Sequence, residues 1–140
     1  MTANRFLQRI QQAGYLLPAG VTATLWLKGL QPHLPGWTCP LRALTGIPCP
    51  TCFLSRATSA ALTGDLSGSL QWHAFGPIAA ATLLGWSVLS LRERRLLPKV
   101  LRKPTLWLVA AAALMAYWLL RLGLTYGLGL REFPGFPISP

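Results

Sequence analysis

Acidic side chains are almost absent from this chain of 140 residues, which contains only Asp65, Glu93 and Glu132. Its two histidines do not accompany a nucleophile in any arrangement that suggests catalysis. General acid–base catalysis needs carboxylates or imidazoles placed beside the reacting atoms. The sequence therefore lacks the parts of a hydrolase and favours a role that is not enzymatic.

Charged residues of either sign are also scarce, at 11% of the chain. The mean hydropathy of +0.42 excludes an ordinary water-soluble domain and indicates a single membrane domain over residues 1–140. The net charge of +10 comes from basic residues at the ends of apolar runs, not from a basic surface stripe. This placement argues against nucleic acid and for membrane lipid as a partner.

A signal-peptide cleavage site is missing too. Arg5 and Arg9 precede the first apolar run, but no small-x-small site followed by a soluble domain appears, so we expect a retained helix. Pro18 should kink that helix. The apolar runs predict an all-α integral membrane protein with three transmembrane helices, at about 13–30, 76–92 and 105–125.

The basic residues between the second and third runs predict the orientation. Within a dozen positions this connection contains one acid, Glu93, and six basic residues: Arg92, Arg94, Arg95, Lys99, Arg102 and Lys103. Short connections rich in lysine and arginine stay in the cytoplasm. The N-terminus is then cytoplasmic, and both the segment 31–75 and the C-terminus lie on the far side of the membrane.

Prolines and glycines break the segment 31–75 too often for it to span a membrane. We expect an interfacial helical hairpin there, between the first and second transmembrane helices. Its first helix should cover 49–62, with Pro50 at the first position and Gly64 as a left-handed stop. Asp65 should cap the second helix.

All three cysteines lie in this segment, and their order leaves three chemistries open. A structural disulfide from Cys39 to Cys49 or Cys52 is one interpretation, and it leaves the third thiol free or paired with another protein. A catalytic dithiol in the C-P-x-C motif is another, with Arg56 one helical turn from each sulfur. On an oxidising face, at least two of the three thiols should be engaged.

The third chemistry is a metal site. Cys39, Cys49 and Cys52, completed by His33 or His73, would supply four ligands for tetrahedral zinc or for an iron centre. The histidines are otherwise expected at the membrane interface, or as axial ligands to a haem or a pigment.

A resemblance adds to these patterns. Residues 39–52 read CPLRALTGIPCPTC, and Leu54-Ser55-Arg56-Ala57 and Thr63-Gly64-Asp65-Leu66 follow. This signature, over about 39–91, resembles the bacterial membrane proteins catalogued as domain of unknown function 2752. The resemblance implies a helical protein of a bacterial inner or thylakoid-type membrane. The chain departs from the signature at Thr51 and Phe53, where the family has glycine, at Ser55 for threonine, and at His73-Ala74 for Asn-Pro.

Phe53 in place of a small residue suggests packing against lipid or a partner. Taken together, the sequence favours a small, non-catalytic accessory or assembly subunit of a larger membrane complex, with other membrane subunits as partners. The alternative is a membrane thiol-redox or metal-handling protein built on the cysteines. Arg121 lies within apolar sequence and should face the helix bundle. Its expected partners are carbonyl groups at the end of the 49–62 helix or in the turn at Gly64-Asp65.

Overall fold

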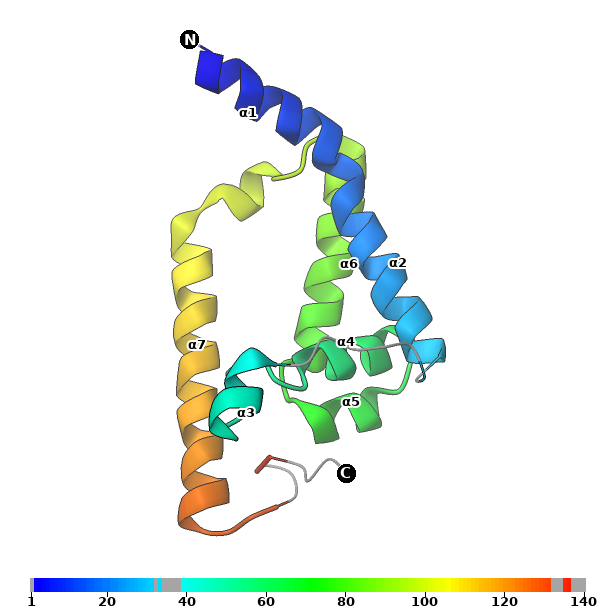
Figure 1. Cartoon of the computed structure of the whole chain (residues 1–140). Coiled ribbons are helices and arrows are strands. Elements are labelled where there is room, and N and C mark those ends of the chain that lie inside the picture. Colours follow the sequence, from blue (N-terminus) through cyan, green and yellow to red (C-terminus); the bar gives the residue numbers. More distant parts are fainter. Residues whose placement is uncertain (1, 32, 34–38, 132–134, 137–140) are drawn as a thin grey trace.

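The computed structural model describes residues 2–31, 33, 39–131 and 135–136 (Figure 1). Within these residues every regular element is a helix and none is a strand. In chain order they are α1 (Thr2–Ala13), the 3₁₀ turn η1 (Gly14–Leu16), α2 (Leu17–Leu30), α3 (Pro40–Thr45), α4 (Leu54–Leu62), α5 (Leu66–Trp72), α6 (Gly76–Glu93), the 3₁₀ turn η2 (Lys99–Arg102), α7 (Pro104–Leu122) and the π-helical turn η3 (Gly123–Gly127). The all-helical fold class is confirmed.

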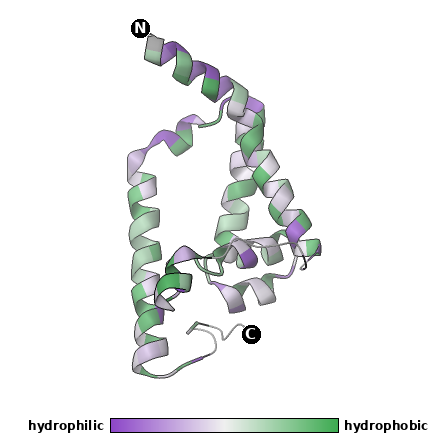
Figure 2. Cartoon of the chain, viewed as in Figure 1, coloured by the Kyte–Doolittle hydropathy of each residue, from purple (hydrophilic) through white to green (hydrophobic). Residues whose placement is uncertain are grey.

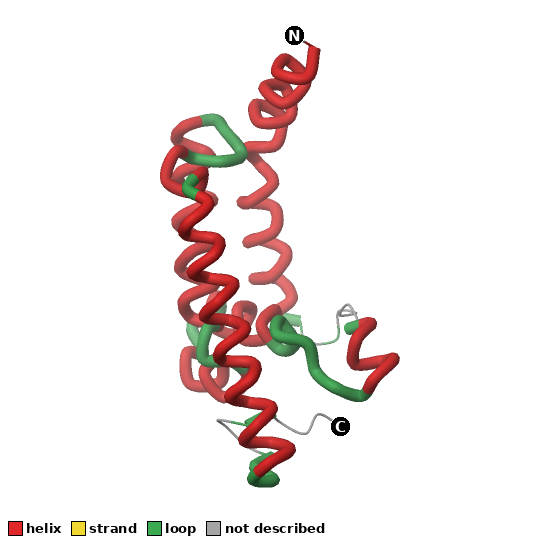
Figure 3. The backbone as a smooth tube through the Cα atoms, turned by 90° about the vertical axis from the view of Figure 1, so that its left-hand side faces the viewer, coloured by secondary structure: helices red, strands yellow, loops and turns green. Residues whose placement is uncertain are grey.

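Helices α2 and α6 run antiparallel and side by side, and α4 crosses their lower ends (Figure 1, Figure 3). A Cβ added at Gly29 of α2 would stand 2.7 Å from the carbonyl oxygen of Ser59 in α4. A Cβ added at Gly76 of α6 would stand 2.6 Å from the Cβ of Ala57. Glycine therefore sets the close spacing of α2, α4, α5 and α6, which we call the packed region.

Small polar side chains fill the interior of the packed region. The hydroxyls of Thr22 and Ser87 lie 2.9 Å apart between α2 and α6. Ser69 in α5 donates a hydrogen bond of 2.6 Å to the Ala57 carbonyl of α4. Close approach through glycine, alanine, serine and threonine is typical of helices that pack together in lipid, where large apolar side chains gain nothing by leaving the surface.

Helix α7 stands apart from α2 and α6 along most of its length (Figure 1). With η3 it forms one span candidate, Pro104–Gly127, which contains an 18-residue window of mean hydropathy 1.7 in which only 6% of the residues are buried. Leu108 is 70% exposed and Val109 63%. Figure 2 shows the apolar colour along this helix, whereas hydrophilic residues gather at α1 and around η2. The helix therefore presents an apolar surface that the chain itself does not cover.

In the described part of the chain, α7 is the one helix long and apolar enough to cross a membrane by itself. Helices α5 and α6 pass the same test only as a pair, and they are bent by 114° at the break between them. The predicted first span begins with the turn η1, and Pro18 lies in the first turn of α2, which leaves 14 helical residues. The prediction of three transmembrane helices thus stays a prediction.

Two expectations for the hairpin are confirmed. Gly64, just after α4, has a φ of +94°, a left-handed conformation that costs glycine little. Asp65 caps α5, because its carboxylate accepts a hydrogen bond of 2.8 Å from the Gly68 amide. These two residues turn the chain back on itself and fix α5 against α4.

Candidate thiol and metal site

The three cysteine sulfurs meet at the lower end of the molecule. All three Sγ atoms lie within 4.8 Å of one another, and those of Cys49 and Cys52 are 3.0 Å apart. No two of them form a disulfide. Cys39 directly precedes α3, whereas Cys49 and Cys52 lie on the turn before α4. The fold thus brings Cys39 to the turn that contains Cys49 and Cys52, although a separate helix, α3, lies between them in the sequence.

The predicted helix from residue 49 is wrong, because the chain forms turns from 49 to 53 and α4 begins at Leu54. The Cys52 amide donates to the Cys49 carbonyl and the Leu54 amide to the Thr51 carbonyl, each at 3.0 Å. Phe53 then takes a φ of +69°, which no helix permits. Cys49, Cys52 and Arg56 consequently do not share one helical face.

Backbone amides point at the sulfurs. The Cys49 amide donates to Cys52 Sγ at 3.0 Å. The Arg42 backbone amide, followed by the side chains of Cys52 and Cys49, lowers the pKa of Cys39 to about 6. Burial, followed by the neighbouring thiols of Cys49 and Cys39, raises the pKa of Cys52 to about 12. At neutral pH, Cys39 is therefore a thiolate and Cys52 a protonated thiol, because an amide donor favours the charged form and burial opposes it.

Two arginines and two aromatic rings flank the cysteine turn. The rings of Phe53 and Trp72 stack with centroids 5.8 Å apart. The guanidinium of Arg42 lies 5.5 Å from the Phe53 ring centre, and that of Arg56 lies 4.7 Å from the Trp72 ring centre. Phe53 therefore packs on Trp72 within the chain, and its expected contact with lipid or a partner stays a prediction, since the side chain is only half-buried.

The lower half of α7 attaches to the same segment. Trp118 donates through Nε1 to the Pro48 carbonyl at 2.8 Å, directly before Cys49. The Tyr117 hydroxyl accepts from the Ala74 amide at 3.2 Å. These bonds join residues 70 and 43 positions apart in sequence, so they close the fold around the cysteines.

Arg121 is only 1% exposed, which confirms that it faces inward. Its expected partners were wrong. It donates to the carbonyl of Trp72 at 3.3 Å and to that of Gly135 at 2.6 Å, and its guanidinium lies 4.3 Å from the Phe136 ring centre. Neither the end of α4 nor the turn at Gly64-Asp65 contributes a partner, because the part of the hairpin that contacts Arg121 is the end of α5, at Trp72.

The histidines do not join the sulfurs. His73 is 1% exposed, accepts through Nδ1 from the Phe75 amide at 3.2 Å, and packs edge-on against Tyr117. His33 is exposed, and the cluster of possible metal ligands in the described residues contains neither histidine. The four-ligand set expected from the sequence is therefore not assembled, and three sulfurs remain.

Four residues of this site were not predicted from the sequence: Arg42, Trp72, Tyr117 and Trp118. Arg121 lies four residues after Tyr117 and three after Trp118, which places it on the same side of the helix as both, and this spacing was the available signal. No local pattern marks Arg42 or Trp72. Their roles come from contacts between segments that are distant in sequence.

Comparison with known proteins finds a family model similar to the segment that contains the cluster. Residues 39–87 match the family model described as Protein of unknown function (DUF2752), which confirms the resemblance over that segment. The match begins at Cys39 and ends within α6, so it contains all three cysteines, α3, α4 and α5. No curated protein and no solved structure matches the chain.

Proposed function

We propose that this chain is a small integral membrane protein that handles a soft metal ion through Cys39, Cys49 and Cys52. The observation that carries the proposal is the meeting of all three sulfurs within 4.8 Å. A metal–thiolate bond is about 2.3 Å long, so one ion can reach all three sulfurs after a small opening of the 3.0 Å pair. Thiolates are the ligands that soft metal ions prefer.

The surroundings of the sulfurs support metal binding. The backbone amide of Cys49 donates to Cys52 Sγ, and hydrogen bonds to ligand sulfurs are a usual means of tuning metal–thiolate sites. Trp118 holds the Pro48 carbonyl from outside the cluster. Supporting contacts of this kind orient the ligands and contribute to metal affinity. A disulfide would use two sulfurs and leave one without a role.

The proposed setting is a bacterial inner or thylakoid-type membrane, crossed by α2, α6 and α7. The basic connection around η2 and the cysteine cluster lie at opposite ends of the molecule, which supports a cytoplasmic basic loop and a cysteine segment on the far side (Figure 1). Cysteines introduced into the basic loop should then react with a membrane-impermeant reagent only after the cells are opened. Labelling of that loop in intact cells would overturn the orientation.

Metal content tests the function. Full-length protein purified in mild detergent from cells grown with added zinc, copper and iron should carry one metal ion per chain by elemental mass spectrometry. Cys39→Ser and Cys49→Ser should lose it, and Ser55→Ala, an exposed change on α4, should keep it. Metal-free protein that neither carries nor takes up any of these ions, and that forms a reversible Cys49–Cys52 disulfide instead, would show a thiol-redox protein.

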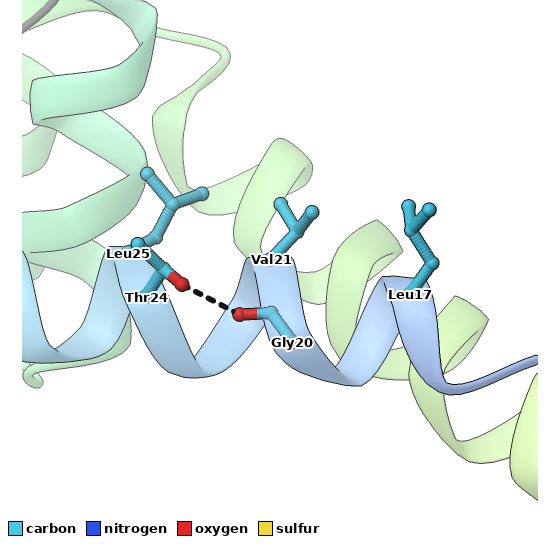
Figure 4. Close-up of a pocket in the computed structure, with 5 residues that line it drawn as sticks. All are labelled: Leu17, Gly20, Val21, Thr24 and Leu25. Atoms are coloured by element: carbon cyan, nitrogen blue, oxygen red, sulfur yellow. Dashed lines mark hydrogen bonds between the residues drawn. The ribbon is translucent and has the colours of Figure 1, made fainter. Parts of the chain in front are cut away.

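A second candidate function is the accessory or assembly subunit, and two surfaces support it. The apolar length of α7 is exposed. On α2 an open apolar groove is lined by Leu17, Gly20, Val21, Thr24 and Leu25 (Figure 4). Gly20 and Thr24 form a small-xxx-small pair, the pattern that lets another membrane helix approach closely.

Co-purification tests the second candidate. Gly20→Leu places a large side chain in the groove, at a position where an added Cβ meets nothing within 4 Å. This variant should lose a membrane partner that the parent retains in mild detergent, while keeping its metal. Absence of any stoichiometric partner from the parent would contradict the subunit role.

A further inference from the structure

We infer that the ion held by Cys39, Cys49 and Cys52 is monovalent and three-coordinate, of the copper(I) class, and not zinc or iron. This inference rests on the proposed metal-handling function and adds the identity of the ion. Three observations carry it: the number of ligands, the separations of their sulfurs and the positive charges beside the cysteine turn.

The number of ligands is three. All three cysteines of the sequence are in the cluster. Among the described residues no histidine, aspartate or glutamate joins the sulfurs. His73 already accepts the Phe75 amide, and Asp65 accepts the Gly68 amide. Structural zinc takes four protein ligands and a protein-held iron–sulfur cluster usually takes four as well, whereas three sulfurs complete a trigonal copper(I) site.

The separations suit that geometry. Three sulfurs bound to one ion in a plane lie about 4.0 Å apart when each metal–sulfur bond is about 2.3 Å. The observed sulfurs all lie within 4.8 Å, and one pair is at 3.0 Å. The Cys49–Cys52 pair must therefore widen by about 1 Å, which side-chain rotation permits while the two backbone hydrogen bonds of the turn stay in place.

The charges near the cluster suit a complex that is strongly anionic. Three thiolates and one monovalent ion leave two net negative charges. Arg42 and Arg56 lie on the Phe53–Trp72 pair beside the cysteine turn, and neither forms an ion pair with an acid in the described part of the chain. Two cations beside the turn favour a complex that keeps a net negative charge, and a monovalent ion leaves one more negative charge than a divalent ion does.

The cluster is partly buried. Cys52 is only 9% exposed, whereas Cys39 and Cys49 are half-buried. The two ions then differ by one ligand, because tetrahedral zinc would add a water at the half-buried side and a trigonal copper(I) would add none.

Competitive titration of the reduced, metal-free, full-length protein in detergent tests the inference. Under nitrogen, copper(I) is titrated against a chromophoric copper(I) chelator, and zinc against a zinc indicator in a parallel sample. One copper(I) per chain should bind at least about a thousandfold more tightly than zinc. X-ray absorption should find three sulfur neighbours at about 2.3 Å and no nitrogen or oxygen neighbour.

Variants separate the ligands from the fold. Cys39→Ser should leave two sulfur neighbours and weaken copper(I) binding by at least about a hundredfold. Ser55→Ala should bind as the parent does. Zinc bound as tightly as copper(I), or a fourth light-atom neighbour in the absorption spectrum, would overturn this inference and leave the metal-handling function standing. Failure of both ions to bind a correctly folded parent would overturn both.

Discussion

The packed region and α7 hold their places by different physical means. Helices α2, α4 and α6 meet through glycines so closely that a single added Cβ would collide at Gly29 or Gly76. Helix α7 has few buried residues and is attached by hydrogen bonds from Tyr117, Trp118 and Arg121 near its C-terminal end. The packed region is thus stabilised by close contact and α7 by a few directional bonds. The cysteine cluster lies where these two kinds of attachment meet.

The largest effect is expected from a change that breaks the packed region. Gly76→Ala places a Cβ 2.6 Å from the Ala57 Cβ and 3.1 Å from the Ala57 carbonyl carbon. The clash can be relieved only if α4 and α6 move apart. We expect a loss of about 1–3 kcal/mol of stability, the usual result of overpacking. Thermal unfolding in detergent, followed by tryptophan fluorescence, measures it.

Gly85→Ala is the matched control, since it lies on the same helix and its added Cβ meets nothing within 4 Å. It should leave stability unchanged or raise it by up to about 1 kcal/mol, because alanine favours the helix more than glycine does. Equal melting temperatures for the two variants would show that close packing does not decide the stability of this region.

Arg121 should give the next effect, which breaks the attachment of α7. Arg121→Leu leaves the carbonyls of Trp72 and Gly135 without their donor, at a cost of about 1–3 kcal/mol. The lower end of α7 should then separate from the cysteine segment, and alkylation of Cys52 in metal-free protein should become roughly tenfold faster. Arg121→Lys keeps the charge without the planar fork and should restore only part of the protection. A Leu variant that protects Cys52 as the parent does would contradict this attachment.

A smaller effect at one bond sharpens the comparison along α7 itself. Trp118→Phe removes the hydrogen bond to Pro48 and should cost about 0.5–1.5 kcal/mol. It should also speed alkylation of Cys49 and Cys52, whose turn follows Pro48. Trp107→Phe removes a similar bond of 2.8 Å, to the Leu101 carbonyl at the other end of α7, and should leave all three thiols unchanged. Identical alkylation rates in both variants would mean that Trp118 does not position the cysteines.

The mildest test separates the thiols by pH. In reduced, metal-free parent protein, alkylation of Cys39 should rise through about pH 6 and be nearly constant above pH 7, because its pKa is lowered to about 6 and only the thiolate reacts. Cys52 should stay unreactive through pH 9, because its pKa is raised to about 12. Mass spectrometry of pulse-labelled peptides gives both profiles. Coincident profiles for the two residues would contradict the assigned charges.

The sequence predicted the parts of this fold that depend on local chemistry. The third apolar run forms α7, as predicted. Gly64 follows the end of α4, and Asp65 caps the start of α5. The inward orientation of Arg121 was predicted from the cost of placing a charge in lipid. The prediction that a helix starts at residue 49 was wrong because Phe53 adopts a positive φ, which is usual for glycine and is not expected from a phenylalanine.

The candidate site was predictable only as a set of cysteines. Their spacing did not show that Cys39 reaches the C-P-x-C turn, since that depends on the path of α3 and the turns after it. The contact of Trp118 with Pro48 spans 70 positions, and its energy depends on where α7 stands after the basic connection. Long-range pairing of this kind is set by the whole fold and leaves no local pattern.

The hydrogen bonds that attach α7 each join a side chain of α7 to a main-chain group of another segment. These main-chain groups are the carbonyls of Pro48, Trp72 and Gly135 and the amide of Ala74. A main-chain carbonyl is the same group whatever residue carries it. The residues that carry these main-chain groups can therefore be substituted without losing the bonds, whereas α7 must keep its tryptophan, tyrosine and arginine. Paired substitutions should not accumulate across this contact, so methods that infer spatial neighbours from covariation would overlook the attachment on which the cluster depends.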